Sequence, residues 1–202
     1  MADTRAARRI EYLSVAWTSF EASAGIIAGV MAGSVALIGF GADSVIEVGS
    51  SLILLWRLSD HELGQQRERT ALKLVGVSFL LLAPYVAWEA IESLVRHQPP
   101  QVSYFGIVFS GLCLVVMPWL ARAKRRLAAR LESRALAADS QQSSICAYLA
   151  AILLGGLALN ALFGWWWADP VAALLMLPII IKEGFEALRG EACGCHDTCH
   201  KS

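Results

Sequence analysis

Residues 35–58 read VALIGFGADSVIEVGSSLILLWRL, and this stretch decides the fold. Its apolar residues fill every side of a helix instead of one stripe, which is typical of a helix that is buried all round or lies in lipid. The stretch exceeds the roughly 20 residues that cross the apolar part of a bilayer. Its two acidic side chains, Asp43 and Glu47, stand four positions apart. The stretch therefore predicts a transmembrane helix that carries two carboxyl groups inside the membrane.

Further segments along the chain have the same apolar character. They cover about Tyr12–Met31, Ala71–Val95, Val102–Leu120, Ala135–Phe163 and Pro170–Leu188. The chain has 202 residues, of which 56% are hydrophobic, and a soluble domain of that size has too little interior to bury several such helices. The sequence therefore predicts an all-α, polytopic membrane protein whose six transmembrane helices form a bundle.

Small and helix-capping residues indicate how the segments are joined. Gly25, Gly29 and Gly33 place a small residue at every fourth position of the first segment, a spacing that lets two membrane helices approach closely. Gly33 is also expected to begin a tight turn into the next segment. Asp169 directly precedes Pro170, a pattern that predicts a cap for the last helix.

The basic residues gather on one side of the predicted membrane. That side holds Arg5, Arg8, Arg9, Arg57, Arg67, Arg69, Lys73, Arg122, Lys124, Arg125, Arg126, Arg130, Arg134, Lys182, Arg189 and Lys201. The other side holds Arg96 and the aromatic run 165–167, which fits a membrane interface. Because Lys and Arg favour the cytoplasmic side, we expect a multi-pass protein of the cell (inner) membrane with both termini cytoplasmic.

The same asymmetry divides the chain into parts. We expect a cytoplasmic N-terminus at 1–11, a six-helix transmembrane domain at 12–188 and a cytoplasmic Cys/His-rich tail at 189–202. The formal net charge is zero, so the chain has no overall field that would attract nucleic acid. We find no nucleophile–base pair or phosphate-binding loop, which argues against an enzyme and against a bound cofactor.

Asp43 and Glu47 need something to balance their charge. A charged group at the centre of a membrane helix costs roughly 2.5–3.5 kcal/mol on insertion scales, and two residues four apart share one helix face. No Lys or Arg is expected at a matching depth, so a metal ion or protons should neutralise the pair. The alternative is that one carboxyl group is simply protonated and buried.

The fifth segment carries a second set of polar groups on one helix face. Asp139, Gln142 and Cys146 are spaced three and four apart, and a carboxylate, an amide oxygen and a thiolate can all bind a cation. The thiolate favours zinc or cadmium over magnesium or calcium, although a cysteine in such a place is often just a small buried residue. Glu21 in the first segment is a further proton- or metal-binding candidate, with a structural hydrogen-bonding role as the alternative.

The end of the chain is dense in thiols and imidazoles. Its candidate ligands are Cys193, Cys195, His196, Cys199 and His200. In a reducing cytoplasm this composition favours metal binding over disulfides, so the tail is a second predicted metal site. The alternative is a terminus without a binding role.

On these residues the chain resembles the cation diffusion facilitator family, and within it the short bacterial, TMEM163-like type that lacks a C-terminal cytoplasmic domain. The resemblance covers the membrane region. Its carriers are Ser34-Val35-Ala36-Leu37, Asp43-Ser44-Val45-Ile46-Glu47, and Ala138-Asp139 followed by Gln142 and Cys146. It implies a cation-efflux-type bundle of six helices, a homodimer, and export of divalent metals in exchange for protons.

The resemblance also implies a metal site between the second and fifth helices. Asp43 and Glu47 match the family's acidic pair, with Glu in place of the usual second Asp. Gln142 stands where the family has His, and Cys146 where it has Asp. The loss of one imidazole and one carboxylate makes a softer ion plausible.

Together these patterns predict a divalent heavy-metal transporter for a zinc- or cadmium-like ion, or another soft divalent ion, that exports metal by proton antiport. The predicted metal ligands are Asp43, Glu47, Asp139, Gln142 and Cys146. One alternative is a membrane-anchored metal-binding or sensing protein without transport. A transporter of an organic cation would use the same acids, but it gives no role to Cys146 or to the tail.

Overall fold

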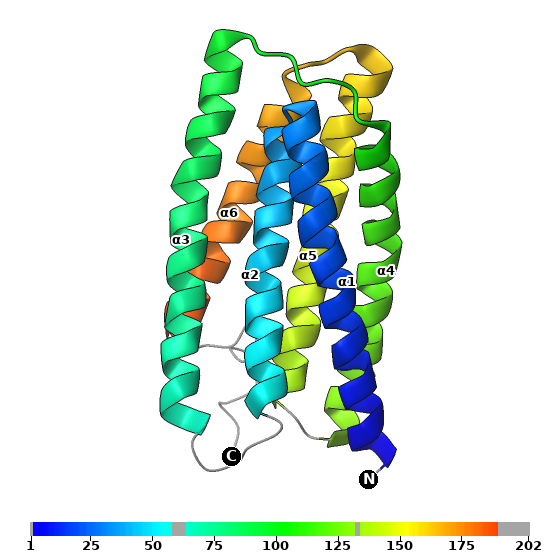
Figure 1. Cartoon of the computed structure of the whole chain (residues 1–202), viewed down its shortest axis with the longest axis vertical. Helices are drawn as coiled ribbons and strands as arrows, with labels where there is room; N and C mark the ends of the chain where they lie inside the picture. Colours follow the sequence, from blue (N-terminus) through cyan, green and yellow to red (C-terminus); the bar gives the residue numbers. More distant parts are fainter. Residues whose placement is uncertain (1, 58–63, 132–133, 190–202) are drawn as a thin grey trace, which may run out of the picture.

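The computed structural model describes residues 2–57, 64–131 and 134–189. Within these ranges the helices are α1 (Ala2–Ala32), α2 (Val35–Arg57), α3 (Gly64–Arg96), α4 (Tyr104–Leu131), α5 (Arg134–Phe163) and α6 (Ala168–Arg189). They run along one elongated bundle (Figure 1). These six helices, with no strand in the described ranges, confirm the predicted all-α bundle.

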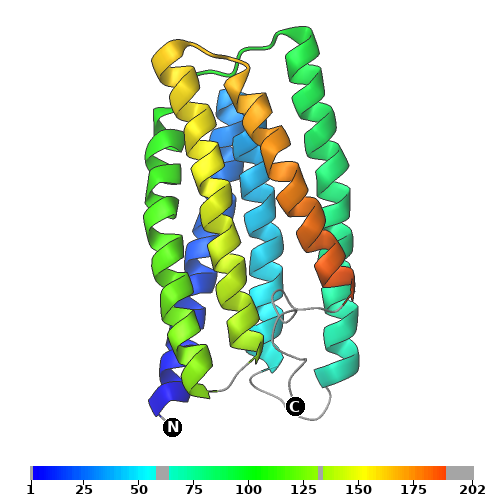
Figure 2. The same ribbon diagram turned by 180° about the vertical axis from the view of Figure 1, so that it is seen from behind.

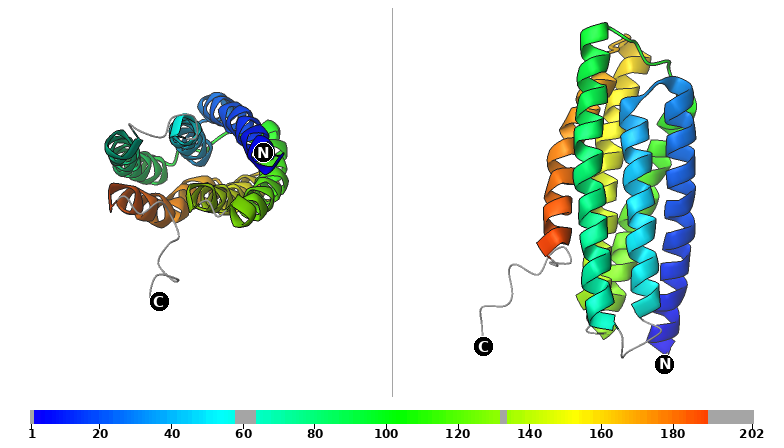
Figure 3. Two further views of the ribbon diagram at one scale, coloured as in Figure 1. Left: turned by 90° about the horizontal axis from the view of Figure 1, so that it is seen from below. Right: turned by 60° about the vertical axis from the view of Figure 1, so that its left-hand side comes forward.

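The helices form two layers. Seen along the bundle, α3, α2 and α1 lie side by side in one layer, and α6, α5 and α4 lie in the other (Figure 3). Each helix contacts one across the layers, because α3 packs on α6, α2 on α5 and α1 on α4. The view from behind shows α5 crossing the middle of its layer between α4 and α6 (Figure 2). Side chains from α1, α2, α5 and α6 therefore meet between the layers.

The outer surface of the bundle is apolar, as expected of a protein in lipid. Among the described residues, four helical stretches are long and apolar enough to cross a membrane: Arg5–Ala32, Gly76–Arg96, Tyr104–Leu131 and Asp139–Phe163. Large apolar side chains that face outward include Leu81, Trp88, Val108, Val115 and Leu175. Several charged side chains are buried in the interior of the bundle instead, which is rare in soluble proteins. The protein is therefore a multi-pass membrane protein.

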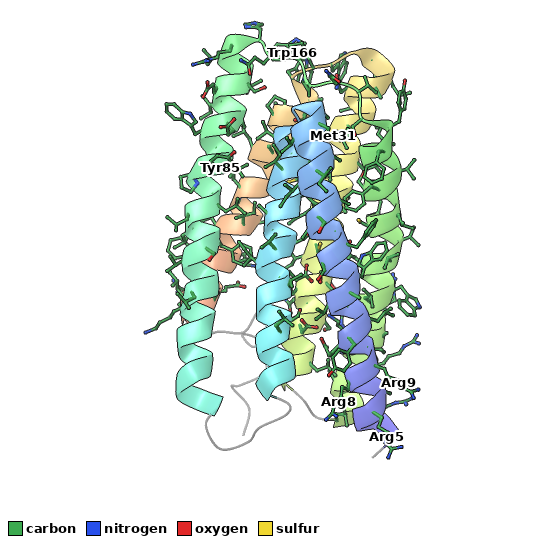
Figure 4. All side chains as sticks on the ribbon, viewed as in Figure 1. Arg5, Arg8, Arg9, Met31, Tyr85 and Trp166 are labelled. Carbon is green, nitrogen blue, oxygen red and sulfur yellow. The ribbon has the colours of Figure 1, made fainter. Side chains whose placement is uncertain are left out.

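Several helices continue beyond the predicted membrane segments. α1 begins at Ala2, well before Tyr12, and α4 continues past Leu120 to Leu131. Arg5, Arg8 and Arg9 lie at the end of the bundle where α1 begins, and Trp166 lies at the opposite end (Figure 4). Apolar content marks only the part of a helix in lipid, whereas backbone hydrogen bonding continues into the polar region. The extensions place Glu11 and Lys124 inside helices.

The first two helices are in close backbone contact. A Cβ atom on Gly41 would lie 2.6 Å from the backbone nitrogen of Ile26, and one on Gly25 would lie 3.0 Å from the Cα of Gly41. A Cβ on Gly29 would lie 2.8 Å from the backbone nitrogen of Ile38. The predicted packing role of Gly25 and Gly29 is confirmed. Gly33, with φ of +63°, forms the predicted turn.

Asp169 caps a different helix from the one predicted. It lies within the first turn of α6, and its carboxylate accepts hydrogen bonds from Ser34 Oγ (2.5 Å) and from the backbone N–H of Val35 (3.0 Å) at the start of α2. The prediction of a cap for its own helix is wrong. The first turn of α2 has unpaired N–H groups that need acceptors, and Asp169 supplies one from across the bundle.

Candidate metal centre

The interior of the bundle holds several buried charged side chains, although large apolar side chains face outward. Those that are less than a tenth exposed are Glu11, Glu21, Asp43, Glu47, Lys124, Asp139, Asp169 and Glu183. Apart from Asp169, which caps α2, they form neighbouring groups with different partners. The partners decide which group is suited to binding a cation.

The central cluster consists of Glu21 on α1, Glu47 on α2 and Cys146 on α5. One ligand atom from each residue lies within 4.8 Å of the others, and all three residues are buried. Two predicted ligands, Glu47 and Cys146, are thus brought together. Glu21 joins them, although the sequence left its role open. A thiol and two carboxyl groups at this spacing suit a zinc- or cadmium-like ion.

Glu21 is held by neighbours on two helices. Trp17, one turn earlier on α1, donates an indole N–H to Glu21 Oε1 at 2.5 Å. The Cys146 thiol donates to Glu21 Oε2 with a sulfur–oxygen distance of 3.9 Å. Cys113 on α4, the other buried free cysteine of the described chain, also lies close to Glu21. The carboxyl group of Glu21 therefore lies among thiols.

Asp43 lies one turn from Glu47 on the same helix and is 0% exposed. Neither of its carboxyl oxygens has a hydrogen-bond partner. The charges nearest to it belong to Glu183, Glu47 and Glu21, and all of them repel it. A buried carboxylate with only like charges around it is stable when a proton or a cation is bound.

Gln142 connects the central cluster to α6. Its side-chain Nε2 donates to Glu183 Oε2 at 2.9 Å, and the other oxygen of Glu183 has no hydrogen-bond partner. Glu183 was not among the predicted ligands. It is an acid inside the last apolar segment, which is a signal for a buried site, but charged neighbours such as Lys182 and Glu186 are equally typical of a solvated helix end. Those two side chains pair with each other at 3.6 Å on the outer face.

Asp139 has a different partner from the one predicted. It forms a buried ion pair with Lys124 on α4, and Ser51 of α2 donates to its Oδ1 at 3.5 Å. Lys124 Nζ lies 4.0 Å from Glu11 Oε2 and donates to the hydroxyls of Ser14 and Ser143. We call Glu11, Lys124 and Asp139 the lysine cluster.

The lysine cluster corrects one expectation from the sequence. We expected no Lys or Arg at the depth of the buried acids, but Lys124 is 0% exposed and also attracts the charge of Glu47. The predicted fourth segment stopped at Leu120, just before a run of basic residues. The helix continues, and only one of its faces points outward, so Lys124 turns into the bundle while Arg122, Arg125 and Arg126 stay exposed. The structure therefore brings Asp139 to an ammonium group, and the metal role predicted for it remains a proposal.

The predicted tail site lies outside the described residues. Its ligands would be Cys193, Cys195, His196, Cys199 and His200. This site remains a prediction from composition.

The sequence of this chain is similar to those of known proteins. A family model described as the cation efflux transmembrane domain matches residues 12–191. Transmembrane protein 163 of Xenopus laevis is 32% identical over 194 residues, which cover 95% of this chain and 69% of that protein. The Cation-efflux pump FieF of Shewanella oneidensis is 27% identical over 128 residues, or 63% of this chain and 43% of that protein.

A third relative is named for the ions it moves. The Cadmium, cobalt and zinc/H(+)-K(+) antiporter of Bacillus subtilis is 29% identical over 122 residues, which cover 56% of this chain and 36% of that protein. The chain thus spans less than half the length of each of these two bacterial relatives. The family model, in contrast, covers nearly all of the bundle, including the central cluster and, from the lysine cluster, Lys124 and Asp139. The chain therefore belongs to the cation efflux family.

Proposed function

We propose that the chain exports a divalent, zinc- or cadmium-like metal ion from the cytoplasm in exchange for protons. The observation that carries this proposal is the central cluster, where Glu21, Glu47 and Cys146 present ligand atoms within 4.8 Å of one another in the interior of a membrane protein. The names of the bacterial relatives, an efflux pump and a cadmium, cobalt and zinc antiporter, support the same class of substrate.

The ligands fit a soft or borderline ion. Glu47 and Cys146 contribute one carboxylate and one thiolate, and Asp43 and Gln142 lie one turn away on the same two helices. A cation among these groups would balance the buried negative charge that Asp43 otherwise carries without a partner. The thiolate favours zinc and cadmium over hard ions such as magnesium. Asp139 is the least suited of the predicted ligands, because Lys124 already balances its charge.

Proton exchange follows from the chemistry of the ligands. Carboxylates and a thiolate bind metal only after losing their protons, so metal binding releases protons and protonation releases metal. A site that faces the cytoplasm would take up metal, and the same site facing outward would exchange it for protons. Such alternating exposure requires the helix layers to move relative to each other around a fixed site. A homodimer in the membrane is expected from the family resemblance.

The test is metal flux into proteoliposomes under a proton gradient. We expect saturable zinc or cadmium flux that is lost in Asp43→Asn. Glu92→Gln is the matched control, because Glu92 is also an acid in a spanning helix but pairs with Arg96 at 3.0 Å, away from the cluster. Equal flux in Asp43→Asn and the unaltered protein would contradict the proposal. Tight metal binding without flux would favour the sensing alternative.

A further inference from the structure

Glu21 is a buried acid without an opposite charge. It is 0% exposed near the middle of α1. Its contacts are Trp17, Cys113 and Cys146, and no Lys or Arg in the described part of the chain forms an ion pair with it. Burying a carboxylate without a counter-charge is strongly unfavourable. Its place in the bundle is therefore best explained by a proton or cation that binds there.

The distance between Glu21 and Cys146 fits a shared metal ion. In a tetrahedral zinc site, bonds of about 2.3 Å to sulfur and about 2.0 Å to oxygen hold the two ligand atoms about 3.5 Å apart. Cys146 Sγ and Glu21 Oε2 are 3.9 Å apart, joined by the thiol hydrogen. An ion could take the place of that hydrogen with a shift of about 0.4 Å. The thiol proton would leave as the ion binds.

Asp43 gives an independent indication that a cation binds here. It is fully buried, neither of its oxygens has a hydrogen-bond partner, and a charge on it would be repelled by Glu183, Glu47 and Glu21. An unpartnered carboxyl group beside the cluster adds negative charge where the protein supplies no donor. A divalent ion would relieve the repulsion among all of these acids.

Glu21 is also positioned as a ligand would be. The indole N–H of Trp17 can only donate a hydrogen bond, so it orients Oε1 without competing for the metal. The other oxygen is left facing Cys146. The backbone contact between Gly25 and Gly41, one turn from Glu21, fixes α1 against the helix that carries Glu47.

We infer that Glu21 is a metal ligand, and that a soft or borderline divalent cation binds between Glu21, Glu47 and Cys146 with one ligand from each of three helices. The inference rests on the proposed function and deepens it. It adds α1 to the site that the family resemblance placed between the second and fifth helices, and it decides between the two roles that the sequence left open for Glu21. It also gives the site three anionic ligands without Gln142.

The test measures cadmium binding by the purified full-length protein in detergent. Every variant carries Cys193→Ser, Cys195→Ser and Cys199→Ser, so the ultraviolet absorption of cadmium–thiolate bonds reports only thiols within the membrane. Glu21→Gln should raise the Kd for cadmium at least about 10-fold. Glu21→Asp, which keeps the charge, should bind more tightly than Glu21→Gln. Glu92→Gln, the control, should bind like the parent.

The results separate this inference from the proposed function. Cadmium absorption that requires Cys146 but is unchanged by Glu21→Gln would overturn the inference and leave the transporter proposal standing. No cadmium absorption and no flux in the parent would overturn the proposed function itself. If Glu21→Gln does not fold, Glu21→Asp is compared with Trp17→Phe. A greater loss of affinity from Trp17→Phe would then overturn the inference, because the carboxylate should matter more than the group that orients it.

Discussion

The lysine cluster and the central cluster lie in the same bundle and share helices α1 and α5, yet their charges are balanced differently. In the lysine cluster, the ammonium group of Lys124 lies against Asp139 and close to Glu11, and serine hydroxyls accept its remaining hydrogen bonds. In the central cluster Glu21 has no such partner in the described chain, and neither has Asp43 beside the cluster. Asp139 and Glu11 therefore lie against an ammonium group of the protein itself, whereas Glu21 and Asp43 do not.

This difference separates two uses of a buried acid. An acid paired with a covalently attached ammonium group holds helices together, and a free metal ion would have to displace that group to bind. An acid beside only thiols and other acids is stable when an exchangeable cation or proton arrives. A buried acid therefore indicates helix packing in one cluster and cation binding in the other, depending on the side chains around it.

The largest effect is expected from removing the internal cation. Lys124→Met should leave Asp139 and Glu11 buried without their partner and destabilise the protein by about 3–5 kcal/mol. Asp43→Asn should be neutral or stabilising, because it removes a buried charge that has no partner. Unfolding of the two variants in detergent gives the comparison. Similar losses in both would mean that the clusters do not differ in charge balance.

Added metal should stabilise only through the central cluster. Zinc or cadmium at about 100 times its Kd should stabilise the unaltered protein by about 2.7 kcal/mol. The same gain should be absent in Glu47→Gln, which removes a ligand of the central cluster, and present in Glu92→Gln. A thermal shift that persists in Glu47→Gln after Cys193→Ser, Cys195→Ser and Cys199→Ser would contradict the assignment of the ion to this cluster.

The two buried cysteines offer a matched pair of variants. Cys146→Ser should lower the ratio of cadmium to zinc affinity by about 10-fold, because it exchanges a soft ligand for a hard one. Cys113→Ser should leave that ratio nearly unchanged, since Cys113 lies close to Glu21 but outside the central cluster. Competition titrations with the two ions measure the ratio. Equal effects of the two substitutions on this ratio would contradict the ligand role of Cys146.

The smallest effect is expected at a surface ion pair. Arg96 and Glu92 lie 3.0 Å apart one turn from each other on α3, with side chains 64% and 27% exposed. Arg96→Ala should change stability by at most about 0.5 kcal/mol. Unfolding under the conditions used for Lys124→Met checks this. A loss as large as that of Lys124→Met would show that burial does not set the strength of these pairs.

Much of the fold could be predicted from apolar content alone. The six helices were expected, and so was the close approach of Gly25 and Gly29 to the next helix. The helix ends were not, because the run of apolar residues stops at the lipid boundary while the helix continues. The partner of Asp169 could not be predicted either, since a local pattern does not show that the start of α2 lies beside α6.

The candidate site was also only partly predictable, because residue spacing shows which side chains share a helix face but not which helices meet. Spacing of three and four showed that Gln142 and Cys146 share a face, and Glu47 and Cys146 do meet. Spacing could not show that Asp139, on that same helix, lies closer to Lys124 than to the central cluster. Spacing also could not show that Glu21 is the acid of α1 that approaches Cys146. That depends on how α1 and α5 are rotated about their axes.

The glycine contact between α1 and α2 has a consequence for how long an ion stays bound. Since Gly25 and Gly41 bring these two helices into backbone contact, Glu21 and Glu47 would move together, whereas Cys146 belongs to α5, which packs most extensively on α4. A motion that parts the two bodies leaves the ion on carboxylates and removes its sulfur. Zinc tolerates that exchange better than cadmium does. Discrimination between the two ions would then show in their dwell times, with the more tightly held ion leaving last and crossing most slowly.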